Sequence, residues 1–248
     1  MFEARTILRH ASTVLVGQLA VMAFGIADTV IAGRYAASAL AALSVGSSIY
    51  ISIYVALNGL MQALLPAWAE LHGGGRHAEL GRAVRQALYI ATGAAVLGIG
   101  GLWFPEIWLS LTEVPTELWP DVRAYLRILA MALVPSLMFR MYSTLNQSLG
   151  LPRLVTWLQA AALLVKVPLS YALTFGLPGV PGMGVVGCAW ATLAVNTWLM
   201  LMGIYFLRSQ KVYQEFKIWQ AMEAPNWKML KEFLVIVPTI TCTIKVSR

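Results

Sequence analysis

The stretch Thr13–Gly33 (TVLVGQLAVMAFGIADTVIAG) decides what kind of fold this chain can have. It is apolar almost throughout and long enough to cross a bilayer as one helix, which takes about 20 residues. Its single charged residue is Asp28. A carboxylate at that depth costs roughly 2.5–3.5 kcal/mol on insertion scales, and such residues usually bind a cation, carry a proton or pair with another charge.

The rest of the 248-residue chain repeats this apolar character. Hydrophobic residues make up 59% of it and charged residues 12%, whereas soluble domains contain about 25% charged residues. Five further runs reach the length of a membrane span: Ala41–Trp68, Val84–Phe104, Val122–Leu149, Leu154–Phe175 and Val185–Leu207. The sequence therefore predicts an all-α integral membrane protein built as a six-helix bundle.

We expect three regions along the chain. Residues 1–207 form the membrane bundle, residues 208–232 a cytoplasmic linker, and residues 233–248 the start of a seventh helix. The apolar run Phe233–Ile244 is too short to span a bilayer, so this seventh helix is expected to be incomplete. A truncated product or fragment is the preferred interpretation, and a half-length transporter that dimerises is the alternative.

The distribution of basic residues predicts the orientation. Most lysines and arginines of the loops fall on one expected side of the membrane, at the N-terminus and in alternate loops. They are Arg5, Arg9, Arg76, Arg82, Arg85, Arg153, Arg208, Lys211, Lys217, Lys228 and Lys231. The opposite loops carry Arg34 and Arg123 together with several acidic residues. The positive-inside rule then places the N-terminus in the cytoplasm. The net charge is +7, and the basic residues behind it lie mainly in alternate loops. This distribution indicates membrane topology rather than nucleic-acid binding.

Lys166 is the candidate partner of Asp28, because it lies in the middle of the fifth span, too far from either end to reach water easily. Pro168 disturbs the same helix. The two charges form either a proton-sensitive functional pair or a neutral structural pair, and both readings stay open. Arg140, in the fourth span, is expected to extend to the inner interface.

Other polar residues within the spans are candidates for hydrogen bonding between helices or for lining a cavity. Most such side chains simply form hydrogen bonds between helices. A subset is expected to line a cavity: Gln18, Asn58, Asn146 and Asn196. Cys188 and Cys242 lie in apolar segments and are interpreted as small buried hydrophobic residues. No motif of a phosphate-binding loop, a serine hydrolase or a zinc site is present, so neither an enzyme nor a metal site is predicted.

Several motifs in fixed order resemble one family. They are Gln18 ten positions before Asp28, ADTVIAG followed by SALAALSVGSSIY, LNQSLGLPR, VPLSYALTFG and GMGVVGCAWAT. From about Gly17 to Glu232, the chain resembles the N-terminal half of a multidrug and toxic compound extrusion (MATE) transporter. The resemblance implies one half of a twelve-helix fold in a bacterial-type inner membrane. It also implies export of cationic or aromatic compounds in exchange for Na⁺ or H⁺, without a cofactor.

The resemblance assigns a cation- or proton-binding site. The aspartate of the family's first span falls on Asp28, a polar pair of the fifth span on Lys166 and Ser170, and a threonine of the sixth span on Thr192. The lysine departs from the family's pattern of oxygen ligands. An ammonium repels Na⁺, which prefers oxygen, so H⁺ is the expected coupling ion.

The same resemblance also implies binding partners, and it leaves two alternative functions open. The expected partners are small-molecule substrates, membrane lipids, and either a missing C-terminal bundle or a second copy of this chain. One rival is a flippase for lipid-linked oligosaccharides of the related superfamily, which would use cationic residues against pyrophosphate. Another is an inactive remnant.

Overall fold

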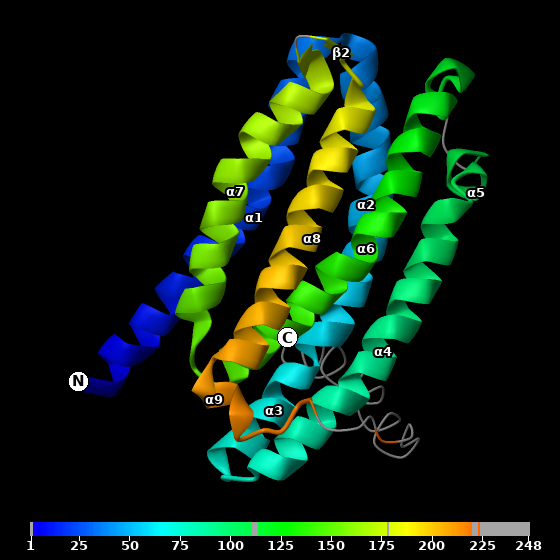
Figure 1. Cartoon of the computed structure of the whole chain (residues 1–248). Coiled ribbons are helices and arrows are strands. Elements are labelled where there is room, and N and C mark those ends of the chain that lie inside the picture. The colour runs from blue at the N-terminus through cyan, green and yellow to red at the C-terminus, as the bar shows by residue number, and fades with distance from the viewer. Residues whose placement is uncertain (1, 111–113, 178, 220–222, 224–248) are drawn as a thin grey trace, which may run out of the picture.

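The computed structural model describes residues 2–110, 114–177, 179–219 and 223. In this part the chain folds into long helices that lie side by side and are joined by short turns (Figure 1). In chain order the elements are α1 (Phe2–Tyr35), α2 (Ala37–Gln62), α3 (Leu64–Gly73), α4 (His77–Trp103), α5 (Glu106–Ser110), a 3-10 helix (Thr116–Leu118), α6 (Trp119–Ser148), α7 (Pro152–Phe175), β1 (Gly176–Leu177), β2 (Val180–Pro181), α8 (Val185–Ser209) and α9 (Lys211–Gln214).

Six stretches of helix are long and apolar enough to cross a membrane. They are Ser12–Tyr35, Ala37–Gly73, His77–Trp103, Thr116–Ser148, Pro152–Phe175 and Val185–Ser209. Each overlaps one of the six runs expected from the sequence, so the all-α membrane bundle is confirmed. The expected seventh helix, residues 233–248, lies outside the described residues.

The second stretch, expected as the single span Ala41–Trp68, is divided into two helices, α2 and α3. The helix is interrupted at Ala63, whose backbone N–H still bonds to the carbonyl of Gly59 at 3.0 Å. Pro66 explains the interruption, because it has no N–H to bond to the carbonyl of Gln62 and its ring would clash with that carbonyl. In the first turn of α3 the missing N–H has no helical partner to lose.

The turn between α6 and α7 is set by glycine and proline. Gly150 adopts a φ of 70°, a conformation that favours glycine. The N–H groups of Gly150 and Leu151 bond to the carbonyls of Gln147 and Asn146, at 3.1 and 2.8 Å, which closes the end of α6. Pro152 then opens α7 in the first turn, where proline is favoured. The two helices are therefore antiparallel neighbours.

The connection between α7 and α8 is a small hairpin. Strands β1 and β2 pair antiparallel, with Gly176 opposite Pro181. This hairpin joins α7 to α8 at the end of the bundle opposite α9 (Figure 1). The pairing keeps those two helices close together where they leave the turn.

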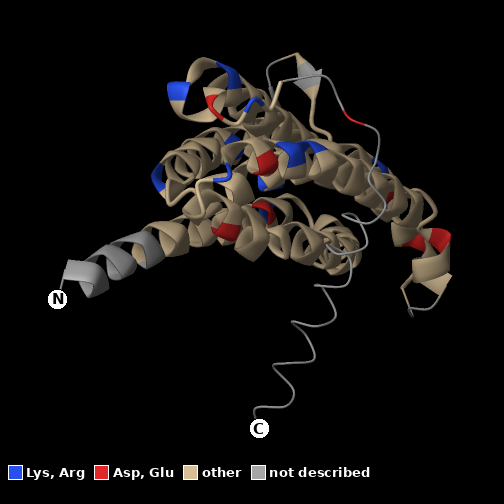
Figure 2. Cartoon of the chain, turned by 90° about the horizontal axis from the view of Figure 1, so that it is seen from below, with Lys and Arg blue, Asp and Glu red and all other residues tan. Residues whose placement is uncertain are grey.

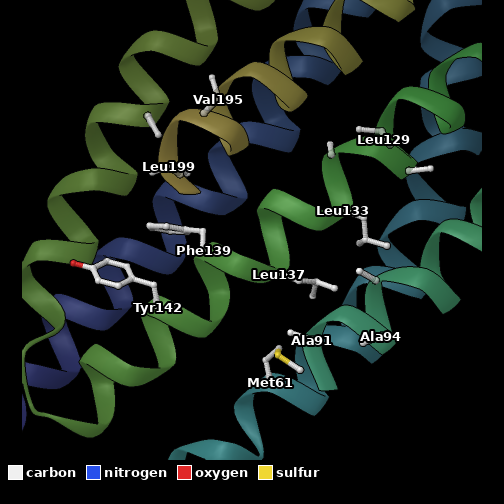
Figure 3. Packing of buried hydrophobic residues seen from close by; sticks show 14 of the residues in the cluster. Met61, Ala91, Ala94, Leu129, Leu133, Leu137, Phe139, Tyr142, Val195 and Leu199 are labelled. Carbon is white, nitrogen blue, oxygen red and sulfur yellow. The ribbon is translucent and has the colours of Figure 1, made fainter. Parts of the chain in front are cut away.

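Helix α6 lies at the centre of the bundle. It packs against α2, α3, α4 and α8, while α7 packs against α1 and α8. Figure 3 shows Leu133 and Leu137 of α6 facing Met61, Ala91 and Ala94 of the neighbouring helices. On another side of α6, two of its aromatic residues lie near α8: Phe139 and Tyr142, beside Val195 and Leu199.

Small residues allow the helices to approach closely. A Cβ added at Gly187 of α8 would lie 2.6 Å from the backbone carbonyl carbon of Leu173 of α7. One added at Gly46 of α2 would lie 2.6 Å from the ring of Tyr125 of α6. Such contacts leave no room for a larger residue, as is common between membrane helices.

The segment after α8 is held against the bundle. Tyr213 and Phe216 are buried, and the hydroxyl of Tyr213 donates a hydrogen bond to Oδ1 of Asn146 at 2.7 Å. Arg85 of α4 donates to the carboxylate of Glu223 at 3.0 Å. This hydrogen bond, with the nearby Arg82, lowers the pKa of Glu223 below its usual value. Most of the ribbon is tan in Figure 2, because charged residues make up 12% of the chain.

Candidate functional site

Asp28 and Lys166 form a direct ion pair inside the bundle. Nζ of Lys166 donates to Oδ2 of Asp28 at 2.7 Å. The exposed fraction of the side chain is 2% for the lysine and 8% for the aspartate, so both charges are out of contact with solvent. The pairing predicted from the sequence is therefore present, with α1 supplying the acid and α7 the base.

Two hydroxyl groups complete the contacts of this pair. Ser170 donates to Oδ1 of Asp28 at 3.1 Å. Nζ of Lys166 also donates to Oγ1 of Thr192 at 2.6 Å, and that hydroxyl in turn donates to the carbonyl oxygen of Cys188 at 2.9 Å. The four residues expected to form a cation or proton site thus lie together, on α1, α7 and α8. We refer to Asp28, Lys166, Ser170 and Thr192 as the Asp28 site.

Helical spacing brings these side chains to one place. Lys166 and Ser170 are four residues apart on α7 and therefore share a face, as do Cys188 and Thr192 on α8. Pro168 lies between the first two and α7 continues through it. Since proline lacks an N–H, the carbonyl of Leu164 loses its usual helical donor.

The ammonium group of Lys166 lies between two oxygen atoms of this site. Its donors reach the carboxylate of Asp28 and the hydroxyl of Thr192, and Nζ lies 5.4 Å from the centre of the Phe24 ring. Phe24 precedes Asp28 by one helical turn, so its proximity could have been inferred from spacing but was not. In this arrangement Lys166 neutralises the carboxylate of Asp28. A proton or another cation that binds this carboxylate can free it from the lysine.

The residues expected to line a cavity do not gather around the Asp28 site. Gln18 precedes Asp28 by ten residues, about 15 Å along a helix. It lines a small pocket between α1, α6 and α7, together with Gln147, Thr156 and Gln159. The described residues around this pocket are polar or apolar but uncharged.

The three candidate asparagines have separate environments. Asn146 is fully buried: its amide donates to the carbonyl of Tyr142 and its oxygen accepts from Tyr213, so it links α6 to α9 rather than lining a cavity. Asn196 is half-buried on α8, one turn beyond Thr192. Oδ1 of Asn58 is buried and has no hydrogen-bond partner among the described residues.

The expected position of Arg140 is wrong. The residue is 8% exposed and does not extend to a solvated surface. The reason is the central place of α6, which has neighbouring helices on several sides. Within the part of the chain that the structure describes, no group of three or more His, Cys, Asp or Glu residues is arranged to hold a metal ion.

The sequence matches the family model described as MatE over residues 14–172. A probable multidrug resistance protein NorM of Aromatoleum aromaticum is 35% identical over 231 residues, which cover 93% of this chain and 50% of that protein. The multidrug resistance protein PmpM of Pseudomonas aeruginosa is 32% identical over 226 residues, covering 90% of this chain and 47% of that protein. The chain thus spans about half the length of these relatives.

Solved structures agree with these matches. The MATE transporter NorM-NG, solved as a complex that includes a monobody, is 27% identical, with a TM-score of 0.72 over 90% of this chain and 49% of that one. An outward-facing MATE family transporter of the MOP superfamily is 18% identical, with a TM-score of 0.81 over 94% of this chain and 51% of that one. The second likeness shows the shared fold alone. The chain therefore belongs to the MatE family and corresponds to the N-terminal half of a MATE transporter.

Proposed function

We propose that this bundle is the ion-coupling half of a multidrug exporter. In this proposal the Asp28 site exchanges a proton for a cationic, often aromatic, substrate. The observation that carries it is the buried contact of 2.7 Å between Nζ of Lys166 and Oδ2 of Asp28. Buried ionisable residues in membrane helices are costly and are usually functional.

The contacts of Lys166 favour H⁺ over Na⁺ as the coupling ion. Its Nζ lies 2.7 Å from Asp28 and 2.6 Å from Thr192, so it occupies the position that a small cation would take between these oxygens. A sodium ion would have to displace a positive charge held by two hydrogen bonds. A proton needs only to reach one carboxylate oxygen.

The proposed cycle uses competition for the carboxylate of Asp28. Protonation removes the negative charge, so Lys166 loses its ion-pair partner and the contacts between α1 and α7 weaken. Deprotonation restores a charge that either Lys166 or a substrate cation can neutralise. If one conformation of the transporter binds the proton on Asp28 more tightly than the other, proton movement is linked to substrate release.

Transport requires a second bundle, because family folds enclose the substrate between two halves. We propose that a further half, on a continuing chain or on a second copy, faces this one. The membrane is proposed to be the bacterial inner membrane with the N-terminus in the cytoplasm, and the support is the excess of basic residues in alternate loops.

Substitution of Asp28 tests this function. A chimaera in which residues 1–248 replace the corresponding half of the Aromatoleum relative supplies the second bundle. In everted vesicles energised by a pH gradient, Asp28→Asn should abolish transport of a cationic dye while the protein still inserts. Asp121→Asn removes an exposed carboxylate at the start of α6 and serves as the matched control, with transport unchanged. Full transport by inserted Asp28→Asn would remove this residue from the mechanism.

The alternative of a lipid-linked oligosaccharide flippase has less support. Such a site needs several free positive charges for a pyrophosphate group. Lys166 is already neutralised by Asp28, which leaves Arg140 as a single cation for that role. The same chimaera distinguishes the two functions, because a flippase would not move a cationic dye in response to a pH gradient.

A further inference from the structure

Arg140 is a buried cation that lies apart from the Asp28 site. Its exposed fraction is 8%, and its Nε is enclosed without a hydrogen-bond partner in the described part of the chain. None of the ion pairs among the described residues includes it. A buried charge without a counter-charge is strongly unfavourable, and in membrane helices such charges are normally paired. The position therefore calls for an anion.

The side chains around Arg140 form a row between α2 and α6. On α2, polar side chains recur every four residues along one face: Tyr50, Tyr54, Asn58 and Gln62. On α6, Ser136, Arg140 and Thr144 repeat at the same spacing. We call these two facing sets the α2–α6 polar row.

One contact within the polar row shows its register. Thr144 of α6 donates to Oε1 of Gln62 of α2 at 3.2 Å. Asn58 and Arg140 each lie four residues, about one helical turn, before these two residues and therefore come to the same level.

One level of the polar row is incomplete. Asn58 lies one helical turn before Gln62, at the level of Arg140, and its Oδ1 is buried without a donor from any described residue. Nε of Arg140 is likewise a buried donor without an acceptor among them. Buried polar atoms in native proteins are nearly always satisfied, so a missing group is the simplest reason for two such atoms at one level.

This level is separate from the Asp28 site. The residues of the Asp28 site come from α1, α7 and α8, whereas Arg140 and Asn58 come from α6 and α2. No hydrogen bond or ion pair among the described residues joins the two groups. A ligand of Arg140 would therefore have a site of its own.

We propose that Arg140 and Asn58 form a binding site for the oxyanion head of an amphipathic molecule. Guanidinium binds carboxylate or phosphate oxygens through two parallel hydrogen bonds, and the amide oxygen of Asn58 accepts from a hydroxyl or N–H beside that head. The rings of Tyr50 and Tyr54 stack with centres 5.6 Å apart and supply an apolar surface next to the charge. The site thus fits a flat organic acid or an anionic lipid headgroup.

Binding to the purified 248-residue chain tests the proposal without transport. In phosphatidylcholine nanodiscs, isothermal titration calorimetry compares 2-naphthoate with its uncharged analogue 2-naphthamide. The carboxylate should bind about tenfold more tightly or better, as expected for hydrogen bonds to a charged group. Equal affinity of the two probes for the wild-type chain would overturn the proposal, whatever the variants do.

Variants then assign the preference to Arg140. Arg140→Gln should abolish the difference between the two probes, and Arg140→Lys should retain part of it, because lysine keeps the charge but not the planar pair of donors. Arg123→Gln is the control, since Arg123 is partly exposed and pairs with Glu106 at 2.9 Å. A preference for naphthoate that persists in folded Arg140→Gln would place the anion elsewhere and contradict the proposal.

The lipid composition distinguishes the two sources of the oxyanion. If adding phosphatidylglycerol removes the preference of the wild-type chain for naphthoate, a lipid headgroup occupies the Arg140 site. If the preference persists, the site selects a soluble organic acid. Both results support an oxyanion site.

Discussion

At the scale of single residues, Asp28 and Lys166 form a buried ion pair in which each charge depends on the other. Their ionic contact is 2.7 Å long and almost completely enclosed. In a low-dielectric interior, removing one partner leaves an uncompensated charge, and this is more harmful than removing both. The pair should therefore behave as a unit.

A double-mutant cycle tests that unit. Lys166→Leu alone should lower the free energy of unfolding by about 3–5 kcal/mol, because Asp28 loses its counter-charge. The double variant Asp28→Asn, Lys166→Leu should lose less than the single variant. Reversible unfolding in SDS micelles measures both, with the exposed Lys211→Leu as control. A double variant less stable than either single variant would show that the two charges do not stabilise each other.

Much of the Asp28 site could be predicted from the sequence, because helical spacing and the resemblance to MATE transporters identify Asp28, Lys166, Ser170 and Thr192. Their hydrogen bonds confirm that these residues lie together. The burial of Arg140 could not be predicted. Apolar residues lie on every side of α6, so the hydrophobic pattern gives no signal of which residues face the neighbouring helices.

At the scale of elements, composition and length were enough to predict the six spans, since a bilayer imposes about 20 apolar residues on each. The interruption of the second span at Ala63 was missed, although Pro66 was its signal in the sequence. Packing partners could not be predicted. Which helix lies at the centre depends on contacts between residues far apart in the chain, and those place α6 there.

Helix α8 packs so closely against α7 at Gly187 that one added methyl group there should lower stability. Gly187→Ala should lower stability by about 1–3 kcal/mol, because its Cβ would lie 2.6 Å from the carbonyl carbon of Leu173. Gly93→Ala is the matched control. No described atom lies within 4 Å of a Cβ there, and alanine favours a helix over glycine by about 1 kcal/mol. Thermal unfolding in detergent should place the midpoint of the first variant below wild type and the second at or above it. The reverse order would refute this packing.

At the scale of the whole molecule, the basic residues predict one orientation in the membrane. Single cysteines replace Ala78, Ser209 or Thr116, all exposed, in a background with Cys188 and Cys242 changed to alanine. In intact cells, an impermeant maleimide should label Thr116→Cys and should label the other two only after the membrane is opened. Labelling of Ala78→Cys or Ser209→Cys in intact cells would reverse the proposed topology.

The most direct test of the central claim separates the two candidate coupling ions. The claim is that Lys166 blocks Na⁺ at Asp28, so that only protonation releases the carboxylate. Everted vesicles containing the chimaera receive a cationic dye in the outer medium and either a pH gradient at fixed Na⁺ or an Na⁺ gradient at fixed pH. We predict dye transport with the pH gradient and none with the Na⁺ gradient. Transport driven by Na⁺ at fixed pH, and lost in Asp28→Asn, would contradict the claim.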